Sequence, residues 1–180
     1  MPRTPKMNRY TLRSGLTIFP EHYKIIDQLL ADVVQKIPAR FVVLTDVSGQ
    51  LISSRGDQGR ANLVALGSLV AGDLAASQEI ARLIGEYQDY QMVLREGRHA
   101  HTFITEAGHH LALLVQISSE VPLGWARMII RQVAQQLAQI VASVPSELME
   151  SELNASVEML VNDEALPDLF SEALDDLWTE

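Results

Sequence analysis

The stretch that decides the fold is ANLVALGSLVAGDLAAS, from Ala61 to Ser77, because it carries almost no polar side chains. A helix on a protein surface normally has one apolar stripe and one polar face. Here only Asn62 and Asp73 are neither apolar nor small. We therefore expect a helix that is covered from two directions. Large side chains share one side (Leu63, Leu66, Val70 and Leu74), and small ones recur on another (Ala61, Ala65, Ser68, Gly72 and Ala75).

A helix and a hairpin are expected before this stretch. In residues 20–37 apolar side chains return every three or four positions, which predicts a helix. Pro20 stands where a first turn tolerates proline, and Pro38 follows the expected end. The segment RFVVLTDVSGQLISSRG, residues 40–56, predicts two strands joined by the turn DVSG. A loop, DQGR, then leads into the small-residue helix, which we expect to end near Ile84.

Three strands and a last helix are expected after it. YQMVLREG (90–97) has the period of a strand, and HAHTFITEAG (99–108) and HHLALLVQIS (109–118) predict a hairpin that turns at residues 106–108. Pro122 and Gly124 introduce the helix WARMIIRQVAQQLAQIV. The predicted order is α-β-β-α-β-β-β-α. The fold class is α/β of the α+β type, with a five-stranded antiparallel sheet sandwiched by helices.

The charges divide the chain into three segments. The net charge is -9, but residues 1–131 hold 14 basic and 12 acidic residues, whereas residues 132–180 hold 11 acidic residues and no basic one. We distinguish a basic N-terminal arm (1–18), a folded body (19–144) and an acidic C-terminal tail (145–180). The body has no dense stripe of Lys and Arg, so we expect no binding to nucleic acid.

Composition sets further bounds. With 47% hydrophobic residues the chain can form a core, and with no cysteine it has neither disulfides nor a thiolate metal site. No apolar signal segment follows the basic N-terminus, and the small-residue helix is shorter than the roughly 18–20 residues of a membrane span. We expect a cytoplasmic protein that does not insert into membranes.

Motifs for chemistry are weak. GSLVAG, residues 67–72, spaces two glycines like a phosphate-binding loop, but it lies within the expected helix and no Lys-Ser/Thr pair follows. No nucleophile elbow, metalloprotease motif or paired carboxylates occur. Arg55 and Arg60 flank the loop before the helix and are the candidates for a phosphate contact. We expect no catalytic residue and no cofactor.

Four of the five histidines lie close together in sequence: His99, His101, His109 and His110. A hairpin that turns around Ala107 would keep His109 far along the ladder from His101, and His109 and His110 would point to opposite faces. Zinc ligands must converge to about 2 Å from the metal. We therefore interpret the histidines as exposed polar positions and predict no metal site. His99 and His101 share a face and remain the one pair open to weak metal binding.

The chain resembles the Roadblock/LC7 family from about Tyr23 to Val144. The resemblance is carried by VVLTDVSGQLISSRG, by NLVALGSLVAGDLAASQEIARLIGE, by LREGRHAHTFITEAGHHLALLVQI and by PLGWARMIIRQVAQQL, in that order. It implies that residues 19–144 are a Roadblock/LC7 domain, a module for interaction rather than an enzyme. The arm and the tail lie outside the family's minimal domain.

The resemblance implies a homodimeric regulator or scaffold protein for a small Ras-like GTPase, and some members of the family activate that GTPase. In the family the central helices pack together, and the third strands pair across a two-fold axis. The dimer interface would then consist of Ala61, Ala65, Ser68, Gly72 and Ala75 on the helix, with Tyr90, Met92 and Leu94 on the strand. The alternative is a PAS- or profilin-like small-molecule sensor, which needs a ligand cavity. A hydrolase or metal enzyme comes third.

The acidic tail contains a regular apolar stripe between residues 166 and 178. Its spacing predicts an amphipathic helix with acidic residues on the opposite face. A short isolated helix is marginal in water, so we expect the stripe to dock, either on the protein's own dimer, steered by the basic arm, or in a partner's groove. The residues expected to dock are Leu166, Leu169, Phe170, Leu174, Leu177 and Trp178.

Overall fold

The computed structural model describes residues 10–85 and 91–143. In chain order the elements are β1 (Tyr10–Thr11), β2 (Thr17–Ile18), α1 (Pro20–Lys36), β3 (Ala39–Asp46), β4 (Leu51–Gly56), α2 (Leu63–Leu83), β5 (Met92–Glu96), β6 (Ala100–Ala107), β7 (Leu111–Ser118) and α3 (Leu123–Ala142). After the small β1–β2 hairpin, this is the predicted order α-β-β-α-β-β-β-α.

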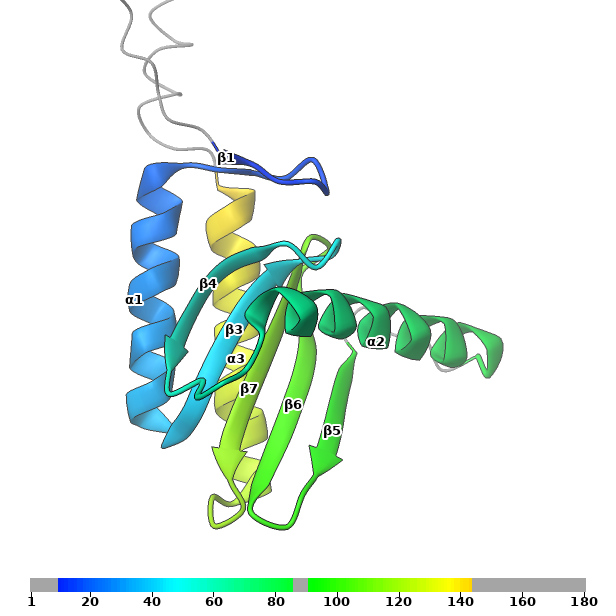
Figure 1. Cartoon of the computed structure of the whole chain (residues 1–180). Coiled ribbons are helices and arrows are strands. Elements are labelled where there is room, and N and C mark those ends of the chain that lie inside the picture. The colour runs from blue at the N-terminus through cyan, green and yellow to red at the C-terminus, as the bar shows by residue number, and fades with distance from the viewer. Residues whose placement is uncertain (1–9, 86–90, 144–180) are drawn as a thin grey trace, which may run out of the picture. The chain divides into compact units, whose positions relative to one another are not determined.

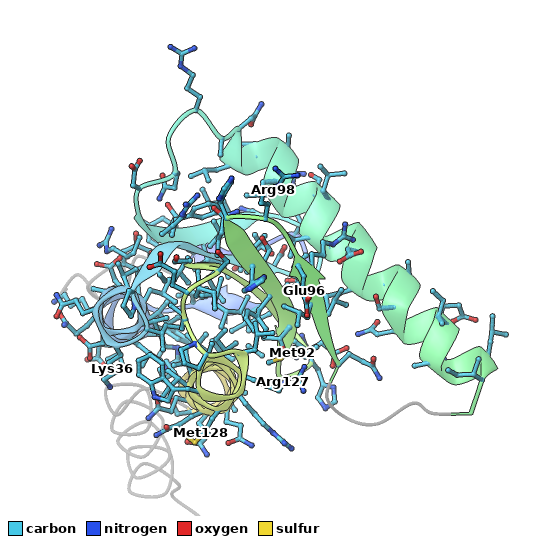
Figure 2. The ribbon with its side chains drawn as sticks, turned by 90° about the horizontal axis from the view of Figure 1, so that it is seen from below. Lys36, Met92, Glu96, Arg98, Arg127 and Met128 are labelled. Atoms are coloured by element: carbon cyan, nitrogen blue, oxygen red, sulfur yellow. The ribbon has the colours of Figure 1, made fainter. Side chains whose placement is uncertain are left out.

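The main sheet has five antiparallel strands in the order β4-β3-β7-β6-β5. Helices α1 and α3 lie on one face, and α2 alone crosses the other (Figure 1). The view from below separates the same three layers (Figure 2). The predicted fold class is confirmed. Strands β4 and β5 form the two edges of this sheet.

Two hydrophobic clusters hold the layers together. The larger lies between the sheet and the α1/α3 layer, and it includes Leu30, Phe103, Leu113 and Ile130, all fully buried. The smaller lies under α2, where Val70 and Leu74 pack against Val43, Ile104 and Leu114. Strands β3 and β7 are central and buried on both faces, which explains their nearly continuous apolar sequences.

The turn between β3 and β4 is organised by Asp46. This residue is fully buried, and its carboxylate accepts hydrogen bonds from the backbone N–H of Ser48 (3.0 Å), Gln50 (2.8 Å) and Ser14 (3.2 Å). Burial acts to raise the pKa of Asp46, but the hydrogen bonds from Ser48, Gln50 and Ser14 outweigh it, so that the pKa lies below its ordinary value. Asp46 thus joins the turn to the N-terminal hairpin.

The described part of the predicted arm, residues 10–18, is the β1–β2 hairpin. Leu12 and Ile18 of this hairpin are buried, and the N–H of Arg13 donates to Oε1 of Gln50 (3.0 Å). Residues 10–18 therefore pack on the body. The sequence did not reveal this hairpin because its strands have only two residues each.

The turn between β6 and β7 differs from the prediction. We expected a turn centred on Ala107, but Ala107 is fully buried in β6 and pairs with Leu111. The chain reverses instead at Gly108, His109 and His110, where Gly108 adopts a φ of +71°. The register is set by the burial of Ala107 and Leu111 in the core, which outweighed the local turn pattern.

The two glycines inside α2 have different surroundings, which leads to a matched prediction. A Cβ at Gly67 would lie 2.5 Å from the carbonyl oxygen of Gly49, whereas a Cβ at Gly72 would meet nothing within 4 Å. Gly67→Ala should lower the free energy of unfolding by about 1–3 kcal/mol through overpacking. Gly72→Ala should raise it by about 0.5–1 kcal/mol, because alanine favours the helix. Urea unfolding of the two variants checks this, and equal effects would contradict it.

His22 gives the fold a pH dependence. The ring is buried, packs edge-on against Phe19, and places Nε2 3.4 Å from Oγ of Ser143 at the end of α3. Burial lowers the pKa of His22 below 6.5, and nearby Glu21 offsets this only in part. The unfolded chain therefore binds this proton at a higher pH than the folded chain does. The stability contributed by neutral His22 is complete above pH 6.5 and is lost as the pH falls towards the lower folded pKa.

We expect His22→Leu to flatten the dependence of unfolding free energy on pH between about pH 5 and 7. His99→Gln, at an exposed position, is the control and should keep the wild-type slope. Urea unfolding across this range measures both slopes. An unchanged slope in His22→Leu would show that another group is responsible.

Candidate interaction site

The candidate site is built on α2, which crosses the sheet on the face opposite α1 and α3. Asn62 caps the helix, its side-chain oxygen accepting the N–H of Ala65 (3.2 Å). Val70 and Leu74 anchor the helix to the sheet, and its C-terminal half extends beyond β5 (Figure 1). Part of α2 therefore has no strand of the sheet beneath it.

The outward face of α2 is exposed although it is mostly apolar. Large side chains stand in solvent there, with Leu69 69% and Leu83 77% exposed. Small side chains lie between them, and Glu79 and Arg82, which form an ion pair, are the main charged groups. The other exposed apolar or small residues of the helix are Val64, Ala65, Ser68, Gly72, Ala75, Ala76 and Ile80. So large an apolar surface on a folded domain marks an interaction site.

The structure brings most of the predicted interface residues to this region. Ala65, Ser68, Gly72 and Ala75 are all exposed on α2. Ala61 precedes the N-cap Asn62 and therefore lies outside the helix. The prediction that Ala61 belongs to the small-residue face of the helix was wrong. Tyr90 lies outside the described residues.

The predicted strand residues Met92 and Leu94 lie on β5, at the edge of the sheet. Both are half-buried and pack against the cluster under α1 and α3, while Val93 points to the cluster under α2. Among the described residues β5 pairs with β6 alone. Its outer edge thus presents unpaired backbone groups, which favour pairing with another strand.

The sequence pattern missed several large residues of the exposed face. Leu69 and Ile80 share one flank of α2 with Asp73, and Leu83 and Ile84 stand at the C-terminal end that extends beyond β5. The sequence did contain an indication of this, because a helix without a polar side must leave some of its large apolar residues, as well as small ones, exposed on the face away from the sheet. The sequence pattern does not indicate which side of the helix packs against the sheet.

Of the described helices, α2 alone is long and apolar enough to cross a membrane. This test rests on length and composition only, and the core helix of a soluble protein also passes it. Little of this helix is buried in the single chain. The helix therefore needs a further cover, and its attachment to the sheet through Val70 and Leu74 favours protein as that cover.

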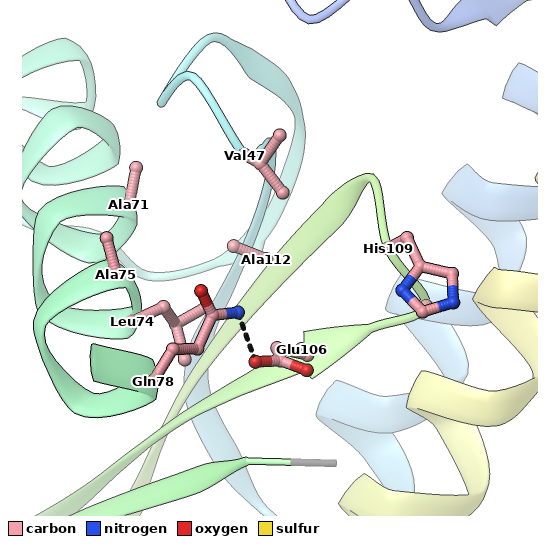
Figure 3. Close-up of a pocket in the computed structure, with 9 residues that line it drawn as sticks. Val47, Ala71, Leu74, Ala75, Gln78, Glu106, His109 and Ala112 are labelled. Atoms are coloured by element: carbon pink, nitrogen blue, oxygen red, sulfur yellow. Dashed lines mark hydrogen bonds between the residues drawn. The ribbon is translucent and has the colours of Figure 1, made fainter. Parts of the chain in front are cut away.

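A small pocket of about 100 Å³ lies between α2 and two turns, the β3–β4 turn that contains Val47 and the β6–β7 turn that contains His109 (Figure 3). The amide of Gln78 on α2 donates to the buried carboxylate of Glu106 on β6, and Val47 and His109 complete the rim. Small-molecule sites in proteins usually have about 300–1,000 Å³. This pocket is too small for such a ligand. The Gln78–Glu106 contact serves instead to attach α2 to β6.

The other candidates for chemistry are also placed. Arg55 forms an ion pair with Asp27 of α1, so it is held on the α1 side and away from α2. Arg60 is exposed before α2. His109 and His110 lie in the β6–β7 turn and His101 within β6, and the described ranges contain no group of three His, Asp or Glu that would hold a metal ion. The docking residues of the tail lie outside the described residues.

Taken together, these features define a class of protein: an α+β domain with two helices on one face of an antiparallel sheet and a single, largely uncovered apolar helix on the other. The chain belongs to the Roadblock/LC7 domain family, whose model matches residues 25–117. No curated protein sequence matches it.

Three solved structures show the same fold. MglB of Myxococcus xanthus is 31% identical, with a TM-score of 0.62 over 67% of this chain and 97% of that one. MglB of Thermus thermophilus, described as a gliding protein, is 25% identical, with a TM-score of 0.67 over 74% and 100%. An MglB in a tetrameric arrangement is also 25% identical, with a TM-score of 0.66 over 73% and 98%.

Proposed function

We propose that the protein is a homodimeric regulator or scaffold for a small Ras-like GTPase and has no catalytic site of its own. The observation that carries the proposal is the uncovered apolar face of α2, next to the open edge of β5. The Roadblock/LC7 family implies both dimerisation and a GTPase partner, and the tetrameric arrangement of one MglB relative supports self-association.

The dimer is built by pairing β5 with its counterpart around a two-fold axis. Helix α2 lies over the start of β5, since Val70 and Leu74 share a cluster with Val93. Arg95, further along β5, reaches back to form an ion pair with Asp73. An axis through the middle of β5 therefore lies on the Asp73 side of α2, and the partner's α2 lies along that side.

The residues on the Asp73 side are those that contact the partner helix. Leu69, Ala76 and Ile80 are four, three and seven residues from Asp73, which is one or two helical turns, so all lie on this flank. The end of α2 that extends beyond β5 lies over the partner's sheet, which covers Leu83 and Ile84. Such an interface should bury at least about 1,200–2,000 Å².

The small residues then form the outer surface of the dimer. Ser68, Gly72 and Ala75 lie away from the Asp73 flank, with Gly72 open to solvent. We therefore reassign them from the helix crossing, where the resemblance to the family placed them, to the surface that receives the GTPase. Small side chains permit a close approach of the partner's backbone, which suits contact with its switch segments.

A nucleotide-dependent binding measurement tests this function. The switch segments of Ras-like proteins differ between the GTP- and GDP-bound states. We expect the dimer to prefer one nucleotide state of its GTPase by at least about tenfold, which corresponds to about 1.4 kcal/mol. Calorimetry with a small Ras-like GTPase, loaded with GDP or a non-hydrolysable GTP analogue, measures this. Equal affinities for the two nucleotide states would agree with a scaffold but contradict a regulator. The absence of binding would contradict both functions.

A further inference from the structure

The small pocket beside α2 contains a buried acid that its contact with the helix does not fully use. Glu106 is only 7% exposed, and the amide of Gln78 donates to its Oε1. The other carboxylate oxygen, Oε2, has no hydrogen-bond or ion-pair partner in the described part of the chain. A buried carboxylate is costly unless donors or a cation surround it. Glu106 is therefore short of partners in the single chain.

The size and the wall of the pocket suit the end of one basic side chain. Among the described residues that line it, Glu106 alone is acidic and none is Lys or Arg. The ring of His109 lies apart from the carboxylate (Figure 3). The volume of about 100 Å³ is too small for a separate ligand but has room for the end of a side chain. A guanidinium or ammonium group would supply the donors that Oε2 lacks.

The pocket opens beside the surface of α2 that we assigned to the GTPase. Ala71, Ala75 and Gln78 follow one another by one turn and form the helix side of the pocket (Figure 3). Ala75 also belongs to the small-residue surface. Asp73 is two positions from both Ala71 and Ala75, which is about 200° around the helix. The partner helix of the proposed dimer therefore lies on the other flank and leaves the pocket open.

We propose that this pocket receives a Lys or Arg side chain of the GTPase, with Oε2 of Glu106 as its acceptor. The inference rests on the proposed function and adds a contact that selects the partner. A GTPase with an apolar or acidic residue at the matching position would cover Glu106 and leave its carboxylate buried without a cation. Glu106 therefore determines specificity, because the wrong partner is penalised as well as the right one favoured.

Calorimetry of Glu106→Gln with a small Ras-like GTPase tests the contact. Glutamine keeps the shape of the side chain and an oxygen for Gln78, so α2 stays attached to β6. We expect the dissociation constant to rise by at least about 30-fold. The rise should persist in about 0.5 M salt, because salt screens a buried pair only weakly. Asp32→Asn is the matched control, since Asp32 is a half-buried carboxylate on α1 that also accepts from a glutamine, and it should bind normally.

Two further measurements keep the proposal falsifiable. Ala71→Leu fills the pocket from its α2 side without changing Glu106, and it should weaken binding of the GTPase by at least about tenfold. A double-mutant cycle identifies the inserted side chain: each Lys and Arg on the GTPase surface is replaced by alanine and tested against the wild type and Glu106→Gln. One of these substitutions should weaken binding to the wild type and have little further effect on Glu106→Gln.

The outcomes separate this contact from the function on which it rests. Unchanged affinity of Glu106→Gln, a loss of affinity that disappears in high salt, or additive effects for every Lys and Arg would overturn the pocket contact and leave the regulator or scaffold in place. A wild-type chain that binds no Ras-like GTPase would overturn both.

Discussion

Replacing Leu69 and Ile80 together by glutamate is expected to convert the proposed homodimer into a folded monomer. Both side chains are exposed in the protomer, at 69% and 60%, so the fold should not depend on them. In the proposed dimer they face the partner's α2, and each carboxylate without a partner would cost several kcal/mol to bury. Each substitution occurs in both subunits of a two-fold dimer. The dissociation constant of the dimer should therefore rise by at least about 10³-fold.

Light scattering or sedimentation at tens of micromolar protein measures the mass, and circular dichroism reports the fold. The matched control is Ile25→Glu/Met128→Glu, which changes two comparably exposed side chains on α1 and α3. This control should remain a dimer. A monomeric wild-type protein would contradict the proposed dimer. A Leu69→Glu/Ile80→Glu variant that stays dimeric would show that the interface lies elsewhere.

Gly72→Leu is expected to leave the proposed dimer intact and to weaken binding of the GTPase. A Cβ at this position meets nothing within 4 Å in the protomer, so the larger side chain points into solvent. On the proposed outer surface it holds the partner away from Ser68 and Ala75. A leucine forced into a close contact costs about 1–3 kcal/mol, and the affinity should fall by at least about tenfold.

Calorimetry with the GTPase, beside light scattering of the variant alone, separates the two effects. Gly124→Leu is the matched control, because Gly124 lies in α3 with equally open surroundings. It should bind the GTPase normally. If Gly72→Leu instead dissociates the dimer, the small residues lie at the helix crossing, as the resemblance to the family implied.

The fold itself could be predicted because most of its elements carry a strong local signal. The three-to-four spacing in α1, the alternation in β5 and the apolar runs of β3 and β7 each indicate their own structure. Two details had no such signal. The β1–β2 hairpin is ordered by contacts of Ser14 and Arg13 with Asp46 and Gln50, far along the chain, and the β6–β7 turn is shifted by the burial of Ala107.

The sequence by itself determined that the small-residue helix needs cover on two sides, because the absence of polar side chains is a local property of the chain. Only the tertiary structure decided which side chains remain uncovered. Val70 and Leu74 turn towards the sheet, Leu69 and Ile80 remain exposed, and a Cβ at Gly72 would meet nothing within 4 Å. Helical periodicity gives the relative directions of side chains on one helix, but their absolute directions depend on where the sheet packs, and that is set by contacts between distant residues.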